Sequence, residues 1–365
     1  MLKGLRISFF GSSLTSAYWN GAATYYRGII RELHKCGHRI TFYEPDVYER
    51  QNHRDIVNLY YADSVVYKPE ITELNRCIEK AKDSDIIIKT SGIGIFDEYL
   101  ESSVLELKSP GKKIIFWDVD APATLDRINK NENDPFIKLI PEYDLVFTYG
   151  GGEPVVTKYA GFGARKCVPV YNALDPSTHF PEYSNERFEG TLGFMGNRLP
   201  DREKRVHDFF FEAATLLPDR KFILGGNGWE SYIPTLNNVK RVGHVFTHEH
   251  NAFYCSTLAT LNINRQSMAD YGFSPPTRIF EAAGAGACII CDKWKGIEEF
   301  LDPGTECIVV NSGKDLADVL KNLTALDAKK IGHAGYERVY SEHTYNKRAH
   351  CIEKELFSCE SIVVR

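Results

Sequence analysis

Short apolar runs alternate with segments of helical periodicity along almost the whole chain, and this alternation constrains the fold more than any other feature. Residues 5–10, 113–117 and 258–263 are largely apolar runs, which is typical of strands buried on both faces of a parallel sheet. Residues 21–36 instead place apolar side chains at helical spacing. Because strands and helices alternate, the sequence predicts an α/β fold with mainly parallel sheets.

The length of the chain and one interruption in the pattern predict two domains. A chain of 365 residues is long for a single core. The alternation breaks at residues 172–183, a segment with two prolines that is typical of a linker. We therefore expect an N-terminal domain over 1–174 and a C-terminal domain over 175–365. The last predicted helix, 345–356, could pack back on the first domain.

The composition is that of an ordinary globular protein, with 43% hydrophobic and 25% charged residues. A net charge of -5 argues against a general nucleic-acid binder. No run approaches the roughly eighteen apolar residues of a membrane helix, and the N-terminus is typical of a first strand rather than a secretion signal. Nine scattered cysteines suit a reducing compartment, so we expect a cytoplasmic protein. The CxxC spacing at 288–291 lies in an apparent buried strand, which favours packing over metal or redox chemistry.

The loop after the first predicted strand holds candidate ligand-binding residues: Ser12, Trp19 and Asn20. Ligands bind in nucleotide-type folds at the carboxyl ends of strands, where this loop begins. The loop lacks the GxGxxG fingerprint of dinucleotide binders. An aromatic lid that packs on its own domain is the alternative.

Two carboxylates, Asp118 and Asp120, follow the predicted strand at 113–117. Because side chains alternate along a strand, both are expected on the same side at its carboxyl end. There they could bind a divalent metal or provide a general base for an acceptor hydroxyl, with Asp120 the first choice as base and Asp118 the second. They could also cap the following turn.

In the second half, residues 271–292 combine a turn, a short helix and a buried strand. Two prolines before Thr277 can fix the first helical turn. Arg278 and Glu281 lie three residues apart, about one turn, and so share one face. A helix start beside an arginine and a glutamate suits a phosphorylated sugar, whereas a solvent-exposed ion pair on a surface helix is the alternative.

A second loop, after the predicted strand at 190–194, contains Asn197, Arg198 and Arg202. A glycine, an amide and several cations between a strand and a helix indicate a diphosphate site, with Arg198 and Arg202 its main candidates. The histidines at 248 and 250 do not match the spacing of a metalloprotease helix, so we expect no metal site.

These segments resemble a known family. The second half is similar to the CgeB-like (spore maturation protein) glycosyltransferases, which have the GT-B architecture of two Rossmann-like domains facing across a cleft. The first half matches more loosely, through FWDVDAP at 116–122 and the region that follows it. The segments that carry the resemblance are GFMGNRLPDREKRV at 193–206, LNINRQ at 261–266, SPPTRIFEAAGAGACIICD at 274–292, GIEEFLDPGTECIVV at 296–310 and ERVYSEHTYNKRA at 337–349.

The resemblance implies transfer of a sugar from a nucleotide-diphosphate sugar, with UDP expected, to a hydroxyl of a glycan or small molecule. It implies that the donor binds the second domain and that neither a cofactor nor a divalent metal is required. The acceptor is implied to bind mainly the first domain, where Ser12, Trp19 and Asn20 are the candidate acceptor-binding residues. Glu281 corresponds to the glutamate that binds the donor ribose, and His244 lies near the base. The other donor-binding residues that it implies are Asn197, Arg198, Arg265, Tyr271, Gly272, Phe273, Ser274 and Arg278.

One position departs from the related retaining enzymes. Many of them carry a second glutamate eight residues before the ribose-binding one, whereas this chain has Phe273 there, and Asp270 is out of register. The sequence therefore leaves open whether the anomeric configuration of the sugar is retained or inverted.

Two alternative functions also remain: a nucleotide-sugar epimerase of the same fold, and a non-catalytic protein that binds a sugar nucleotide or a glycan.

Overall fold

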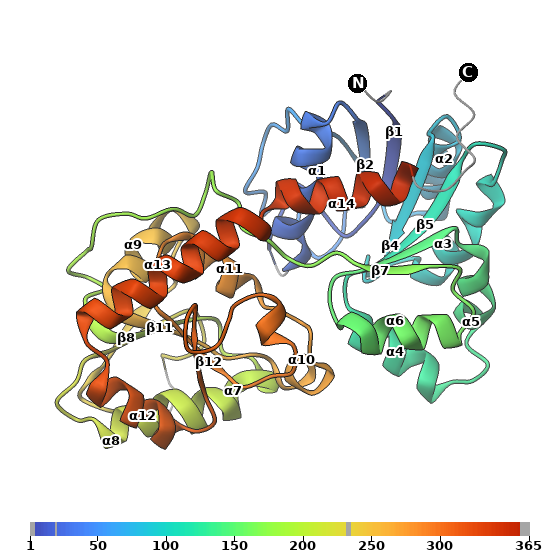
Figure 1. Cartoon of the computed structure of the whole chain (residues 1–365). Helices are drawn as coiled ribbons and strands as arrows, with labels where there is room; N and C mark the ends of the chain where they lie inside the picture. Colours follow the sequence, from blue (N-terminus) through green and yellow to red (C-terminus); the bar gives the residue numbers. More distant parts are fainter. Residues whose placement is uncertain (1–3, 19, 231–234, 358–365) are drawn as a thin grey trace. The chain divides into compact units, whose positions relative to one another are not determined.

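The computed structural model describes residues 4–18, 20–230 and 235–357, and Figure 1 shows its helices and strands. The chain forms two compact units. The first unit comprises Met1–Tyr171 and Tyr345–Arg365, and the second comprises Asn172–Thr344. Each unit is built around one parallel sheet with helices between successive strands, so the α/β class predicted from the alternation is confirmed.

The sheet of the first unit has seven parallel strands in the order β3-β2-β1-β4-β5-β6-β7. β1 pairs with both β2 and β4, so the strand order changes direction between β1 and β4. Every residue of β4 is buried, as its isoleucine run predicts. The strands are Arg6–Phe10 (β1), Arg39–Pro45 (β2), Asp63–Tyr67 (β3), Ile86–Thr90 (β4), Lys113–Asp118 (β5), Leu145–Thr148 (β6) and Cys167–Pro169 (β7).

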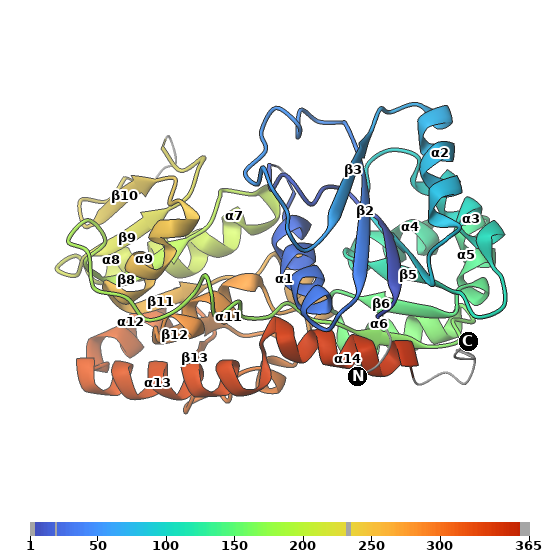
Figure 2. The ribbon, with the colours of Figure 1, turned by 90° about the horizontal axis from the view of Figure 1, so that it is seen from above.

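The last helix of the chain belongs to the first unit, where it lies along α1 (Figures 1 and 2). At Gly28 of α1 a Cβ atom would lie 2.4 Å from the Tyr345 ring, so the glycine allows the two helices to approach closely. Lys113 donates a hydrogen bond to the carbonyl oxygen of Leu356 near the end of α14. The helices of this unit are Ala22–Lys35 (α1), Ile71–Ala81 (α2), Asp97–Ser103 (α3), Ala121–Lys130 (α4), Pro135–Leu139 (α5), Gly152–Gly161 (α6) and Tyr345–Phe357 (α14).

The sheet of the second unit has six parallel strands in the order β10-β9-β8-β11-β12-β13. β8 pairs with β9 and β11, so the direction of the strand order changes between β8 and β11. Such a switch opens a crevice at the carboxyl ends of the strands, where ligands bind in open α/β sheets. The strands are Gly190–Met195 (β8), Phe222–Gly225 (β9), Val239–Gly243 (β10), Thr257–Asn262 (β11), Ile289–Asp292 (β12) and Ile308–Val310 (β13).

The helices of the second unit differ from the prediction at two places. The loop that was predicted to hold Arg202 ends earlier, because the next helix begins at Pro200, and a π-helical turn at His207–Phe211 divides this helix into two. A short helix at Gln266–Tyr271 was not predicted, because its residues have no apolar periodicity. The helices are Pro200–Val206 (α7), Glu212–Leu216 (α8), His250–Cys255 (α9), Gln266–Tyr271 (α10), Thr277–Gly284 (α11), Gly313–Asn322 (α12) and Ala325–Glu342 (α13).

The CxxC cysteines lie in and beside β12, and both are buried. Burial raises the pKa of Cys288 to about 12, so this thiol stays protonated at neutral pH. A protonated thiol is neither a nucleophile nor a good metal ligand, which supports the packing interpretation. Across the ranges that the structure describes, no helix has the length and apolar character needed to cross a membrane.

Candidate donor site and strand-end residues

Two arginine side chains meet at the carboxyl end of β8. A Cβ atom at Gly196 would lie 2.8 Å from a guanidinium nitrogen of Arg202 and 2.8 Å from one of Arg278. Gly196 is itself fixed, because its N–H donates to Gly225 (2.9 Å) and its carbonyl accepts from the Trp229 indole (2.8 Å). The glycine thus brings α7, which carries Arg202, and α11, which carries Arg278, close to one strand end.

The two guanidinium groups also share one aromatic ring. Arg202 lies 5.7 Å and Arg278 5.3 Å from the centroid of Phe194, the β8 residue before Met195. Arg202 is buried, and this burial, together with the charges of Arg278 and Arg265, lowers its pKa to about 9. Placing two like charges side by side in a partly dry site is unfavourable unless an anion joins them.

The described residues supply these two arginines with neutral partners only. Arg202 donates to the carbonyl oxygen of Asn197, and Arg278 donates to the side-chain oxygen of Asn262 (3.1 Å). Within the described ranges, neither guanidinium has a carboxylate oxygen within ion-pair distance. Two cations without an ion-paired carboxylate among the described residues, at the carboxyl end of β8, suit an anion such as a diphosphate.

The other predicted cations have carboxylate partners. Arg198 pairs with Glu203, and Arg265 donates to Asp201 at 2.9 Å. Both arginine side chains are partly exposed, at 35% and 45%. The structure therefore distinguishes Arg202 and Arg278 from Arg198 and Arg265, which the sequence ranked together.

Asn197 and His244, which were predicted to bind the donor, take part in contacts that connect the ends of the neighbouring strands β8, β9 and β10. Asn197, after β8, accepts a hydrogen bond from the N–H of Asn227, after β9, at 3.0 Å. The side chain of Asn227 lies 3.5 Å from the ring of His244, directly after β10. His244 is exposed, and its ring contacts the exposed ring of Phe246. His244 and Phe246 can therefore both reach a ligand at this edge of the sheet.

The turn after α10 holds Phe273 in an unusual conformation. Its φ angle is 45°, in the left-handed region that a bulky residue adopts only when its surroundings enforce it. Its N–H donates to Lys295 (2.7 Å), and its ring occupies the place where a Cβ of Gly296 would lie, 2.2 Å from Cδ1. Ser274 is buried and donates to Gly272 (2.9 Å), and Tyr271 is the last residue of α10. These contacts hold the turn, and Phe273 places a packed ring at the position where the resemblance to retaining enzymes would lead us to expect a carboxylate.

Glu281 lies one turn after Arg278 on α11, but the two side chains do not form the solvent-exposed pair that was the alternative. Arg278 contacts Asn262 and Phe194, whereas Glu281 accepts a hydrogen bond from the Tyr254 hydroxyl at 3.3 Å. Its other carboxylate oxygen lies 3.9 Å from His179 Nε2, and its side chain is 16% exposed. The glutamate is therefore held in place by neighbouring residues.

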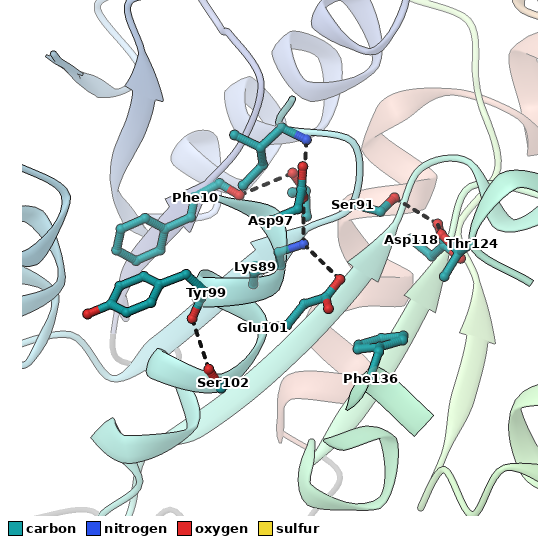
Figure 3. A network of polar contacts seen from close by, with 12 residues as sticks. Phe10, Lys89, Ser91, Asp97, Tyr99, Glu101, Ser102, Asp118, Thr124 and Phe136 are labelled. Atoms are coloured by element: carbon teal, nitrogen blue, oxygen red, sulfur yellow. Dashed lines mark hydrogen bonds and ion pairs between the residues drawn. The ribbon is translucent and has the colours of Figure 1, made fainter. Parts of the chain in front are cut away.

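In the first unit, the prediction that Asp118 and Asp120 face the same side is wrong, because β5 ends at Asp118 and the chain turns into α4. Asp118 is fully buried and accepts hydrogen bonds from Ser91 (2.7 Å), Tyr159 (2.6 Å) and Thr124 (2.9 Å), of which Figure 3 shows those to Ser91 and Thr124. With its oxygens so occupied, Asp118 fits a structural function and not that of a base. Burial raises the pKa of this carboxyl group.

Asp120 is exposed and lies at the N-terminus of α4, where its carboxylate accepts from the N–H of Ala123 at 3.4 Å. Capping, one of the predicted alternatives, thus describes part of its function. The long cap bond leaves the second oxygen available to a ligand. Of the two carboxylates, Asp120 is the one whose placement is compatible with proton transfer.

The predicted acceptor residues Ser12 and Asn20 bind each other. The Ser12 hydroxyl donates to the Asn20 side chain at 3.0 Å, and Asn20 donates to the carbonyl oxygens of Ser13 (3.0 Å) and Ser16 (3.2 Å). Both side chains are buried, so they stabilise the loop itself, as the lid alternative proposed. Trp19, the third candidate, lies outside the described residues.

Lys89 and His179, which the sequence did not single out, and His250, for which it predicted no metal site, make polar contacts in the folded chain. Lys89 in β4 is fully buried and pairs with Asp97 (2.7 Å) and Glu101 (3.5 Å), as Figure 3 shows. A lysine inside an apolar run was the available signal for that network. His179 and His250, which lie beside Glu281, are 71 residues apart in the chain, so no spacing motif connects them.

Residues 202–354 match the family model described as Glycosyl transferase-like, a range that contains Arg202, Arg278 and Glu281. No protein among the curated sequences matches the chain. The family match agrees with the predicted class of enzyme, and the closer resemblance to the CgeB-like family stays a prediction.

Solved glycosyltransferase structures share the fold over nearly the full length. Anabaena HepE in complex with UDP-glucose has a TM-score of 0.68 at 13% identity, covering 97% of this chain and 100% of its own. Sucrose-phosphate synthase from Thermosynechococcus elongatus has a TM-score of 0.70 at 12% identity, covering 97% and 99%. An alpha-glucosyltransferase in complex with UDP has a TM-score of 0.69 at 12% identity, covering 97% and 100%. The chain therefore has the predicted GT-B glycosyltransferase fold of two Rossmann-like domains.

Proposed function

We propose that this protein is a glycosyltransferase that takes its sugar from a UDP-sugar and transfers it to a hydroxyl of a glycan or small molecule. The observation that carries the proposal is the pair Arg202 and Arg278, which converge on Gly196 over one aromatic ring without a carboxylate partner among the described residues. The family match over the same segment and the UDP or UDP-glucose named for HepE and the alpha-glucosyltransferase support it.

The chemistry asks for positive charge at the leaving group. When the sugar–phosphate bond breaks, negative charge develops on the departing diphosphate, and fixed cations stabilise that charge. Two guanidinium groups supply it without a metal ion, so we propose that transfer needs neither a divalent metal nor another cofactor. Glu281 binds the ribose hydroxyls in this scheme, and Asn197 and His244 lie on the side of the base.

Asp120 is our candidate for the base that accepts the proton of the acceptor hydroxyl. We choose Asp120 because it is exposed just after the end of β5, whereas the carboxylate of Asp118 is buried and occupied by hydrogen bonds. A base of this kind would serve an inverting reaction, and Phe273 in place of a carboxylate is in keeping with that outcome. The odd number of cysteines supports a cytoplasmic location.

The test is a binding and turnover panel of UDP-, dTDP- and GDP-sugars. We expect a UDP-sugar to raise the melting temperature and, with an acceptor present, to yield UDP and a glycosylated product. Arg202→Gln should lose that stabilisation, whereas Arg220→Gln, at an exposed position, should keep it. A chain that no nucleotide sugar stabilises would refute the donor assignment. Free epimerised nucleotide sugar without acceptor transfer would identify an epimerase instead.

A further inference from the structure

We propose that His179, His250 and Glu281 form a binding site for a divalent transition metal such as Zn²⁺. Each residue offers one ligand atom, and the three atoms all lie within 4.8 Å of one another. His179 precedes the strands of the second unit, His250 begins α9, and Glu281 lies in α11, so the fold brings together three separate segments.

The tautomer of His179 is set by its neighbour. The Thr178 hydroxyl lies 3.2 Å from the carbonyl oxygen of Asp175, to which it donates, and 2.9 Å from His179 Nδ1. Because the hydroxyl proton is used on Asp175, the Thr178 oxygen accepts the proton that His179 Nδ1 carries. His179 Nε2 then has a lone pair, and this nitrogen faces His250 and Glu281.

His250 presents a second lone pair to the same point. His250 Nδ1 faces His179 Nε2 at 3.3 Å, which is hydrogen-bonding distance. In a neutral ring with its proton on Nε2, Nδ1 carries the lone pair that a metal ion takes up. A cation at this position would be bound by two ring nitrogens and one carboxylate oxygen, and it would displace a proton shared between the two rings.

The spacing matches zinc with a small adjustment. Bonds of about 2.1 Å in a tetrahedral arrangement put neighbouring ligand atoms roughly 3.4 Å apart. The two histidine nitrogens are 3.3 Å apart, and Glu281 Oε1 is 3.9 Å from His179 Nε2. All three ligand atoms lie within 4.8 Å of one another, so Glu281 needs to move toward the two histidines by about one ångström to complete the set.

Neighbouring side chains hold two of the ligands in place. Thr178 orients His179, and Tyr254 donates to the second oxygen of Glu281, the kind of supporting contacts that metal ligands have. Arg278, on the same helix as Glu281, carries a positive charge that opposes a bound cation, so the carboxylate of Glu281 is needed to offset it.

Because Glu281 is also the ribose-binding residue in the proposed function, a metal at this site and a nucleotide sugar compete for one carboxylate. That consequence rests on the proposed function, whereas metal binding itself does not. The two can be tested separately, since metal binding is measured without nucleotide and nucleotide binding after the metal has been removed.

The experiment is a titration of metal-free protein with Co²⁺ under a phosphine reductant, followed by displacement with Zn²⁺. We expect one equivalent of Co²⁺ with the intense visible d–d absorption of four-coordinate sites, and no near-ultraviolet charge-transfer band from a cysteine ligand. His250→Gln should weaken Co²⁺ binding by at least about 100-fold, and Thr178→Val, which alters only the support of His179, by about 10-fold.

The matched control is His248→Gln, an exposed histidine two residues from His250, which should bind Co²⁺ like the parent. Should His250→Gln not fold, Glu281→Gln and Thr178→Val carry the same test. A parent chain without bound Co²⁺, or a His250→Gln variant with unchanged affinity, would overturn the metal site. If Co²⁺ binds but no UDP-sugar does after chelation, the proposed function fails alone; the reverse result removes only the metal site.

Discussion

The two units differ in how charged side chains near their strand ends are paired. In the first unit, buried Lys89 lies between Asp97 and Glu101, and Asp118 is enclosed by hydroxyl donors (Figure 3). In the second unit, Arg202 and Arg278 lie side by side with neutral partners only among the described residues. Buried charge that has its partners within the protein needs no ligand, whereas charge without an ion-paired partner favours one. The comparison supports the diphosphate site that we propose for the second unit.

The largest effect tests whether the first unit holds any reacting group. Asp120→Asn should lower kcat by about 10²- to 10⁴-fold, because it removes the proposed base while keeping the side chain's shape. The dissociation constant for UDP should not change, since that ligand is assigned to the other unit. Steady-state kinetics and calorimetry measure the two quantities.

Asp126→Asn, at an exposed position of α4, is the matched control and should retain full turnover. An Asp120→Asn enzyme as fast as the parent would remove Asp120 as the base.

Breaking the balance of the first unit should cost stability and leave the donor site unchanged. Lys89→Met leaves Asp97 and Glu101 without their shared cation, and one lost partner of a buried pair costs about 3 kcal/mol in the free energy of unfolding. Urea denaturation measures the loss. Lys138→Met, at an exposed position, is the control. If Lys89→Met weakened UDP binding as much as it weakened the fold, the separation between the units would be wrong.

In the second unit, removing a charge should weaken ligand binding without lowering the stability of the fold. Arg278→Gln removes one charge from the anion site and should weaken UDP-sugar binding by about 10- to 100-fold, the loss of one or two hydrogen bonds to a charged ligand. Its folded state should be as stable as the parent or more so, because the repulsion with Arg202 disappears. A thermal melt without ligand and a calorimetric titration with UDP-glucose measure both. Equal affinity in parent and variant would contradict the site.

The smallest effect concerns pH in the first unit. Burial raises the pKa of Asp118 in the folded state above the ordinary value of 3.8. The folded protein thus holds this proton more tightly than the unfolded chain, so its contribution to stability is present at low pH and is lost as pH rises from about 4 through the folded pKa. Asp118→Asn, which cannot ionise, should become more stable relative to the parent as pH rises over that range in urea denaturation. A difference that does not vary with pH would show that the carboxyl group does not titrate in this way.

Much of the fold was predictable from the sequence, because buried parallel strands are recorded directly as apolar runs. The helix with Arg278 and Glu281 was predicted within about one residue, and the strand at 289–292, which was expected from residue 287 to 291, within about two. α10 was missed because a short helix without an apolar face leaves no periodic signal. The π-helical turn at His207–Phe211 left no sign, since three consecutive phenylalanines also suit an ordinary helix.

The site was less predictable, because which carboxylate pairs with which arginine depends on how the folded chain brings them together and not on their order in the sequence. Arg198, Arg202, Arg265 and Arg278 look alike in the chain, and only the contacts with Glu203 and Asp201 separate the paired from the unpaired. Likewise, strand alternation could not reveal that β5 ends at Asp118 and encloses its carboxylate. His179 lies beside Glu281 only in the folded chain, and no pattern in the sequence indicates that the two are close.

The central claim is that Arg202 and Arg278 bind the diphosphate of the donor. The most direct measurement compares the affinities of UDP and uridine for the parent and for Arg202→Gln by calorimetry. We predict that the variant binds UDP about 10- to 100-fold more weakly and uridine as the parent does, because only UDP carries the diphosphate. If both ligands lose affinity equally, or if UDP loses none, the two arginines do not bind the diphosphate and the claim is refuted.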